Sequence, residues 1–255
     1  MEPSSVAKKS KKRRDIVEVV DIIFLDIDGV LLPFGNDSDT TVETYSDECI
    51  FPDRTMDALT SLLEGVANLE FLKKNDRTTT HETTASTGHC SPTPIRGNPK
   101  LVLSSTWRAR PAFIQDILSS FRSYVNAKKD ISTGTREIWQ AHLESFFDIT
   151  DPSYHSTRHE EIYNWIKSNT YYSTTPCQKL PCNKQGRLPA STQQDMQCIV
   201  RSWIALDDEE LVDVQHGYAG TAKHAVKTVS SIGLTRKDVD LALELVKNQM
   251  MEFHL

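Results

Sequence analysis

Short apolar runs alternate along this chain with segments in which apolar residues recur every three or four positions. The first run begins at Val19 and stops at two aspartates, Asp26 and Asp28, which are followed by Gly29. Further runs of strand length occupy residues 100–103, 146–150, 202–206 and 225–229. Because a short apolar run bounded by turn residues is typical of a buried strand, these runs predict a sheet that is mainly parallel.

Segments with helical spacing separate these runs. Apolar residues recur at three- and four-residue intervals in 56–66 and 113–121, and helices are also expected at 136–145, from Arg158 onward and from Thr235 to about Met250. Asp53 is placed to cap the first helix, and Pro111 lies near the start of the second. This alternation of strands and helices predicts an α/β protein.

Two of the predicted strands end in paired acids. Asp26 and Asp28 follow the first strand, and Asp207 and Asp208 follow the strand at 202–206. Alternation along an extended segment would point Asp26 and Asp28 to the same side and turn Ile27 toward packing. Carboxylates from two strands that meet at one sheet edge suit a hard divalent cation such as Mg²⁺. The alternative is an Asp-rich turn in one case and a solvated acidic loop in the other.

Hydroxyl side chains follow the strand at 100–103. Ser104, Ser105 and Thr106 precede Trp107 and Arg108. Hydroxyls, backbone N–H groups and an arginine at the end of a buried strand are suited to binding phosphate oxygens, with Thr106 and Arg108 as candidate substrate-binding residues. The alternative is that the hydroxyls only begin the next turn.

Composition and cysteine usage narrow the class of protein. The chain has 255 residues, of which 38% are hydrophobic and 25% charged, and these values fit a globular core. No apolar run approaches the roughly 20 residues that span a bilayer, and the basic residues at the N-terminus are not followed by the apolar h-region of a signal peptide. An odd number of scattered cysteines argues for a reducing compartment: Cys49, Cys90, Cys177, Cys182 and Cys198. We therefore expect an intracellular protein, cytoplasmic or nuclear, that does not contact a membrane.

Three segments are expected to lie outside the packed fold. Residues 1–14 contain a basic run, although the net charge of the chain is −6: Lys8, Lys9, Lys11, Lys12, Arg13 and Arg14. This run is either a localisation signal, a loose nucleic-acid contact or a solvated disordered tail. Residues at about 73–98 and 169–197 lack periodicity and are interpreted as flexible insertions in one domain spanning 15–255.

Taken in order, the motifs resemble those of the haloacid dehalogenase superfamily of aspartate-nucleophile phosphohydrolases. The matching segments are FLDIDGVLLP, VLSSTWR, RHEEIYNWI and WIALDDE. The combination is most similar to the small domains of this superfamily that occur alone or in RNA-repair proteins, where a Gly-Leu-Thr segment precedes the last helix. Here that segment is Gly233, Leu234 and Thr235. The resemblance implies a Rossmann-like three-layer sandwich with a minimal cap and long loop insertions.

The resemblance also implies a role for each motif. Asp26 would be the nucleophile that forms an aspartyl-phosphate, and Asp28 would protonate the leaving oxygen and then activate water. Ser105 would bind the transferring phosphoryl group, with Ser104 and Thr106 as near alternatives. Asp207 and Asp208 would complete a Mg²⁺ site with Asp26 and the main-chain carbonyl of Asp28.

One position departs from the pattern of the superfamily. The third motif usually carries a lysine, whereas the best-placed cation here is Arg158, which keeps its charge but is not a geometric copy of lysine. The implied function is a Mg²⁺-dependent phosphatase that hydrolyses a phosphomonoester, and a nucleotide or nucleic-acid end is a candidate substrate. The alternative is a non-catalytic module that binds a phospho-ligand or nucleic acid on the same fold.

Overall fold

A computed structural model describes residues 18–35, 49–71, 95–151, 157–169, 198–211 and 221–253 of the chain. The basic tail, most of both predicted insertions and any cap formed by residues 36–48 lie outside the described residues. The prediction of a flexible tail and flexible insertions therefore stays a prediction.

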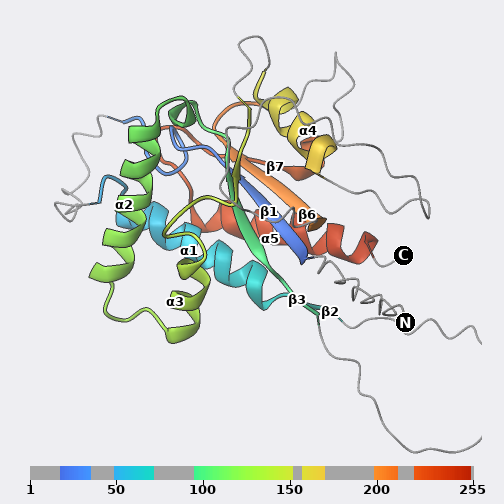
Figure 1. Ribbon diagram of the computed structural model, residues 1–255, viewed down its shortest axis with the longest axis horizontal. Helices are drawn as coiled ribbons and strands as arrows, with labels where there is room; N and C mark the ends of the chain where they lie inside the picture. The colour runs from blue at the N-terminus through green and yellow to red at the C-terminus, as the bar shows by residue number, and fades with distance from the viewer. Residues whose placement is uncertain are drawn as a thin grey trace, which may run out of the picture.

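Five parallel strands form the central sheet, in the order β5-β4-β1-β6-β7 (Figure 1). Their bounds are β1 Glu18–Leu25, β4 Pro99–Leu103, β5 Asp148–Ile149, β6 Cys198–Asp207 and β7 Ala225–Lys227. A separate antiparallel pair consists of β2 (Glu70–Phe71) and β3 (Ile95–Arg96). The central position of β1 explains its nearly continuous apolar sequence, since a strand paired on both edges and covered on both faces exposes almost no side chain.

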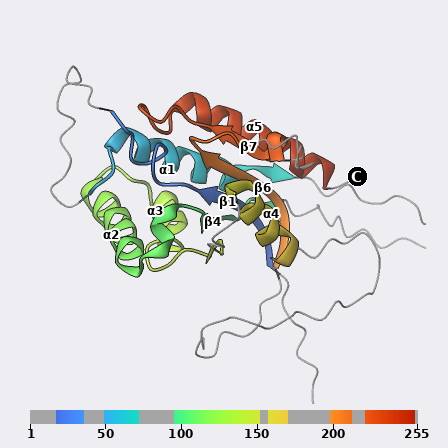
Figure 2. The ribbon, with the colours of Figure 1, turned by 90° about the horizontal axis from the view of Figure 1, so that it is seen from above.

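Helices cover both faces of this sheet. They are α1 (Asp53–Asn68), α2 (Pro111–Ala127), α3 (Thr133–Gln140), α4 (Arg158–Asn169) and α5 (Arg236–Glu252). The larger hydrophobic cluster joins α1, α2, α3 and α5 to the sheet, and the smaller one joins α4 to the opposite face through Ile162, Trp165 and Ile166. Figure 2 shows α1 and α5 on one side of the strands and α4 on the other. The predicted α/β class and Rossmann-like three-layer architecture are confirmed.

The register of the three central strands brings their carboxyl ends together. Leu25, the last residue of β1, pairs with Leu103 of β4 and with Leu206 of β6. Parallel strands in register deliver the residues that follow them to one edge of the sheet. The three motif-bearing loops after these strands are therefore neighbours.

Some predicted boundaries are wrong. Asp53 is the first residue of α1 and not its cap, since Pro52 occupies the cap position without a side-chain hydrogen bond. The helix expected at 136–145 ends at Gln140, and the strands expected at 146–150 and 225–229 keep only two and three residues. The end of the insertion predicted at 73–98 forms β3, and β4 begins directly after it, at Pro99.

The strand expected at 202–206 begins earlier, at Cys198. The prediction missed its first residues because Arg201, which forms a buried ion pair, interrupts the apolar pattern of the sequence. The Arg201 guanidinium donates to both carboxylate oxygens of Asp21 in the middle of β1, at 3.0 and 2.5 Å. Ser202 donates to the same carboxylate at 2.7 Å. A hydrogen-bonded network of this kind can lie inside the sheet, although its residues look in the sequence like a strand boundary.

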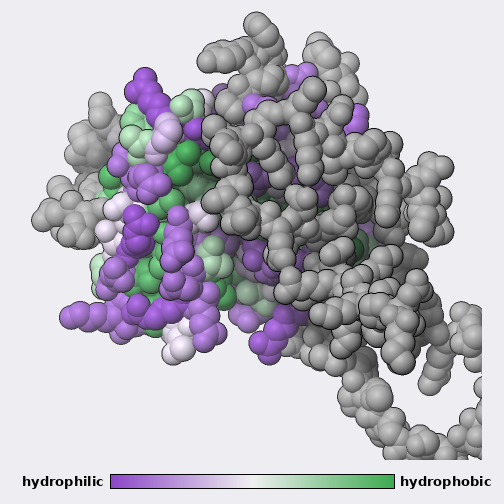
Figure 3. All heavy atoms as spheres, viewed as in Figure 1, coloured by the Kyte–Doolittle hydropathy of each residue, from purple (hydrophilic) through white to green (hydrophobic). Residues whose placement is uncertain are grey.

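The described surface is mixed. In Figure 3 hydrophilic residues line the outer edges of α2 and α3, and hydrophobic atoms show between the helices. Within the part of the chain that the structure describes, no helix has the length and apolar character required to cross a membrane.

Candidate active site

The loops after β1, β4 and β6 meet at the carboxyl edge of the sheet. The backbone N–H of Asp26 donates to the carbonyl of Leu206 at 3.1 Å, and that of Ser104 donates to the carbonyl of Leu25 at 3.0 Å. These bonds continue the strand pairing by one residue into the loops. They fix the backbone of the first, second and fourth motifs relative to one another.

Three carboxylates converge at this edge. Asp26, Asp207 and Asp208 each offer an oxygen, and these oxygens all lie within 4.8 Å of one another. Asp26 and Asp207 are buried, and Asp208 is half-buried. The structure therefore brings together residues 26 and 207, which are 181 positions apart in the chain, as the two pairs of acids in the sequence predicted.

Gly29 allows the first loop to pass close to the third acid. Its φ of 68° lies in the left-handed region, and a Cβ at this position would be 2.3 Å from the Oδ2 of Asp208. The Thr228 hydroxyl after β7 holds the same turn by donating to the Gly29 carbonyl at 2.8 Å. Glycine is thus required here both for the turn and for the position of Asp208.

Arg158 is the cation that faces the acids. At the start of α4, its guanidinium lies 3.7 Å from an oxygen of Asp26 and 3.7 Å from an oxygen of Asp207, with its side chain 10% exposed. Its Nη1 is buried and has no hydrogen-bond partner among the described residues. Arg158 thus lies against both buried acids and keeps a donor for a ligand.

The site carries more negative charge than the protein neutralises. Burial raises the pKa of Asp26, although Arg158 and a hydrogen bond from Ser105 oppose the shift. Burial and repulsion from Asp26 raise the pKa of Asp207 to about 7, with Arg158 again opposing. Burial also raises the pKa of Asp208. Bringing three acids to one point is costly without a cation, and this cost is what a divalent ion would remove.

The hydroxyl groups after β4 lie at different depths. Ser105 is buried and its hydroxyl is hydrogen-bonded to Asp26. Ser104 is also buried, and its Oγ has no hydrogen-bond partner among the described residues. Thr106 is exposed at the start of a short 3₁₀ helix, Thr106–Ala109. Of the three hydroxyls, that of Ser105 therefore contacts Asp26, that of Ser104 is buried without a partner among the described residues, and that of Thr106 is exposed.

Arg108 is engaged with protein groups. Its Nη1 donates to the carbonyls of Ser104 and Ser105 at 3.0 and 2.5 Å, and its Nη2 lies 2.5 Å from a carboxylate oxygen of Glu161 on α4. The two side chains of this ion pair are only 5% and 7% exposed. Arg108 thus connects the loop after β4 to α4, the helix that carries Arg158. The sequence predicted a substrate contact for Arg108 and did not indicate this structural role.

Asp28 is separate from the three-acid cluster. Both of its carboxylate oxygens accept a hydrogen bond from the indole N–H of Trp107, at 3.0 and 3.1 Å. Ile27, between the two aspartates, is fully buried, as the alternation predicted. Trp107 is a functional candidate that sequence reasoning missed, because a tryptophan in a motif gives no sign of which acid its N–H will contact.

The acidic cluster fits a Mg²⁺ ion on the evidence of its donors. All three groups are carboxylates, the ligand type that hard divalent cations prefer. The Oδ2 of Asp207 is buried and accepts no hydrogen bond from the described residues, while its Oδ1 accepts the N–H of Glu209 at 2.9 Å. A buried carboxylate oxygen without a donor is suited to binding a cation.

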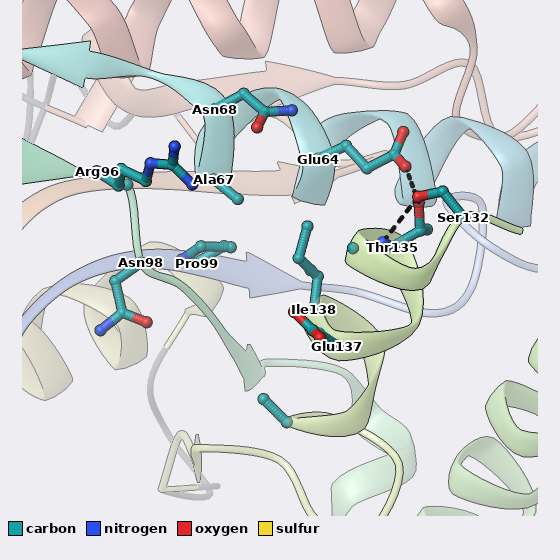
Figure 4. Close-up of a pocket in the computed structure, with 13 residues that line it drawn as sticks. Glu64, Ala67, Asn68, Arg96, Asn98, Pro99, Ser132, Thr135, Glu137 and Ile138 are labelled. Carbon is teal, nitrogen blue, oxygen red and sulfur yellow. Dashed lines mark hydrogen bonds between the residues drawn. The ribbon is translucent and has the colours of Figure 1, made fainter.

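A pocket of about 480 Å³ lies away from this cluster. It is formed by the end of α1, by α3 and by the residues around Pro99 at the start of β4 (Figure 4). The acids follow the opposite ends of the strands. Within the pocket the Thr135 hydroxyl bonds to both Glu64 and Ser132, so these polar groups already have protein partners.

Comparisons of the chain with protein-family models, with curated proteins and with solved structures found no match. Function therefore has to be inferred from the residues and geometry of the site itself.

Proposed function

We propose that this protein is a Mg²⁺-dependent phosphatase of the haloacid dehalogenase type, which hydrolyses a phosphomonoester through an aspartyl-phosphate. The observation that carries the proposal is the meeting of Asp26, Asp207 and Asp208 within 4.8 Å, opposite the guanidinium of Arg158. A binding module would need the arginine and the hydroxyls, but it would have no use for a buried carboxylate presented as a nucleophile.

The residues of the site would have separate binding roles. Asp26, Asp207 and Asp208 would hold Mg²⁺, which supplies positive charge against the phosphate oxygens. The free Nη1 of Arg158 and the Ser104 hydroxyl would donate to the same oxygens. Phosphoryl transfer needs mainly alignment and charge neutralisation, and these donors supply both around one buried carboxylate.

In the first step, a carboxylate oxygen of Asp26 forms a bond to phosphorus. The bond between phosphorus and the leaving oxygen breaks, and its electron pair stays on that oxygen. The leaving oxygen takes a proton from the carboxyl group of Asp28 and departs as an alcohol. Asp26 then carries the phosphoryl group.

In the second step, water attacks the same phosphorus while the carboxylate of Asp28 accepts a proton from it. The bond between phosphorus and the Asp26 oxygen breaks, and the electron pair returns to the carboxylate. Inorganic phosphate leaves, and both aspartates regain their starting forms. Arg158 keeps its charge in both steps, so it can neutralise the nucleophile and the phosphoryl oxygens without exchanging a proton.

A phosphate-release assay with the full chain tests the proposal. The substrates are p-nitrophenyl phosphate, nucleoside monophosphates, and RNA and DNA oligonucleotides phosphorylated at the 5′ or the 3′ end. We expect Mg²⁺-dependent release from at least one of them and a loss of at least about 10³-fold in Asp26→Asn, because that variant has no nucleophile. Asp116→Asn, an exposed acid on α2, is the matched control and should retain the activity.

Two results would count against the enzyme. Absence of phosphate release from every substrate with Mg²⁺ would contradict it directly. The other result is that the wild-type chain binds a phosphorylated oligonucleotide without turnover. If Asp26→Asn then left that affinity unchanged, the result would support a binding module and not an enzyme.

A further inference from the structure

Trp107 connects the two functional halves of the site. Its indole N–H donates to both oxygens of Asp28, and its backbone N–H donates to the Oγ of Ser105 at 3.4 Å. Ser105 in turn bonds to Asp26. One residue after β4 is therefore linked to the proposed acid–base group and to the serine beside the proposed nucleophile.

The indole ring is itself held in place. Trp107 is half-buried in the short 3₁₀ helix after β4, and its ring packs at a tilt against Phe113 of α2, with ring centroids 5.2 Å apart. A planar indole with two side-chain torsions, packed on a second ring, presents its N–H in a fixed direction. The hydrogen bond to Asp28 is thus made by a donor that was ordered beforehand.

Among the described residues, the Asp28 carboxylate accepts hydrogen bonds from Trp107 alone. Asp28 lies in the turn after β1, is half-buried, and its carboxylate is outside the cluster of the three other acids. An aspartate at such a position can adopt several rotamers, and only some of them aim an oxygen at the leaving group. The two contacts from Trp107 select one rotamer.

We propose that Trp107 is a positioning residue for the acid–base step: its indole N–H holds the Asp28 carboxyl group in the orientation that gives a proton to the leaving oxygen. When Asp28 is protonated, the indole N–H bonds to the carbonyl oxygen of the acid, and the O–H is left to point at the substrate. After that proton has moved to the leaving oxygen, both oxygens of the Asp28 carboxylate can accept from the indole, through the same two contacts that the structure contains. The inference rests on the proposed function.

Trp107→Phe separates this role from simple packing, because phenylalanine keeps an aromatic ring against Phe113 and removes only the donor. The measurement is kcat/KM for two classes of phosphate ester. An alkyl phosphate has a leaving group that needs a proton, whereas 2,4-dinitrophenyl phosphate has one that leaves without it. We expect Trp107→Phe to lose about 10- to 100-fold with the alkyl ester and less than about threefold with the dinitrophenyl ester.

The matched control is Trp165→Phe. Trp165 also donates its indole N–H to an aspartate, Asp148, at 2.8 Å, but that pair lies away from the acids. Trp165→Phe should not change the ratio of kcat/KM between the two esters. An equal loss with both esters in Trp107→Phe, or no loss with either, would overturn the proposal, since both results show that the indole does not act through leaving-group protonation.

A second measurement does not depend on turnover. The chain has four tryptophans, so its ¹⁵N–¹H spectrum contains four indole signals, and the one missing from Trp107→Phe belongs to Trp107. Asp28→Asn should shift that signal and leave those of Trp139, Trp165 and Trp203 in place. An unmoved Trp107 signal would refute the hydrogen bond itself. A shifted signal in a chain that releases no phosphate would instead leave the contact standing and refute the proposed function.

Discussion

Two arginines near the acids, Arg158 and Arg108, have different partners. Arg158 faces the acids, whereas Arg108 lies behind it and pairs with Glu161, three residues further along α4. Arg108 and Arg158 repel each other, and this repulsion together with burial lowers the pKa of Arg108. Glu161 is thus the counter-charge that lets two guanidinium groups lie close together.

Glu161→Gln should weaken both the fold and the activity. The variant leaves Arg108 without its counter-charge, which costs about 3–5 kcal/mol when one partner of a buried ion pair is removed, but the hydrogen bond that glutamine can still accept offsets about 1.5–3 kcal/mol of that cost. We expect the free energy of unfolding, measured with urea, to fall by roughly 1–3 kcal/mol. We also expect kcat to fall about tenfold, because α4 no longer holds Arg158 firmly against Asp26.

Glu210→Gln is the comparison for this prediction. Glu210 pairs with Lys227 at 3.4 Å on the surface, where the two side chains are 68% and 55% exposed. An exposed pair of this kind contributes less than about 1 kcal/mol. Equal effects of the two substitutions on unfolding would show that the Arg108–Glu161 pair has no special role.

His142 is a buried titratable residue away from the site. Its side chain is 2% exposed, neither ring nitrogen has a hydrogen-bond partner among the described residues, and burial lowers its pKa to about 4. The folded protein therefore holds this imidazole neutral while the unfolded chain protonates it near pH 6.5. Its contribution is present above pH 6.5 and is lost as the pH falls toward 4.

This difference predicts a pH-dependent stability. Between pH 7.5 and pH 5 the wild-type protein should lose about 2 kcal/mol of unfolding free energy through His142. His142→Leu, which has a similar volume and no titrating group, should remove that part of the loss in urea unfolding measured at the two pH values. A pH dependence that is the same in both proteins would exclude His142 as its source.

At the scale of helices and strands, the sequence predicted what depends on local pattern. The strand before Asp26 and the helices beginning at Pro111 and Arg158 were recognisable from apolar spacing and start signals. The last helix is capped by Thr235, whose side chain accepts the N–H of Asp238 while Asp238 accepts the N–H of Thr235. These elements carry their signals within a few residues.

Elements that depend on distant partners were predicted less well. The start of β6 was missed because Arg201 becomes acceptable inside a sheet only when Asp21 of β1 pairs with it. The short β5 and β7 lie at the two edges of the sheet, where pairing ends after two or three residues for reasons that the apolar pattern does not contain. In the site, the acids were found from their place after strands, whereas the contacts of Trp107 and Arg108 depend on tertiary packing.

At the scale of the whole molecule, the fold brings together acids that are far apart in the sequence. Strands β1 and β6 pair along their whole shared length, and this pairing places Asp26 beside Asp207 and Asp208. The packing of α4 on the opposite face from α1 and α5 then brings Arg158 over the same edge. Burial raises the pKa of each of the three acids, and repulsion within the cluster adds to the rise for Asp26 and Asp207.

If the three acids form one divalent-cation site, a titration of Mg²⁺ into the metal-free protein, followed by isothermal calorimetry, should detect the bound ion. We predict one ion bound per chain, and an affinity that falls by about tenfold or more in Asp207→Asn. It should be unchanged in Glu210→Gln, an exposed acid of the same loop. Binding of equal strength in wild-type and Asp207→Asn proteins, or no binding at millimolar Mg²⁺, would contradict the account.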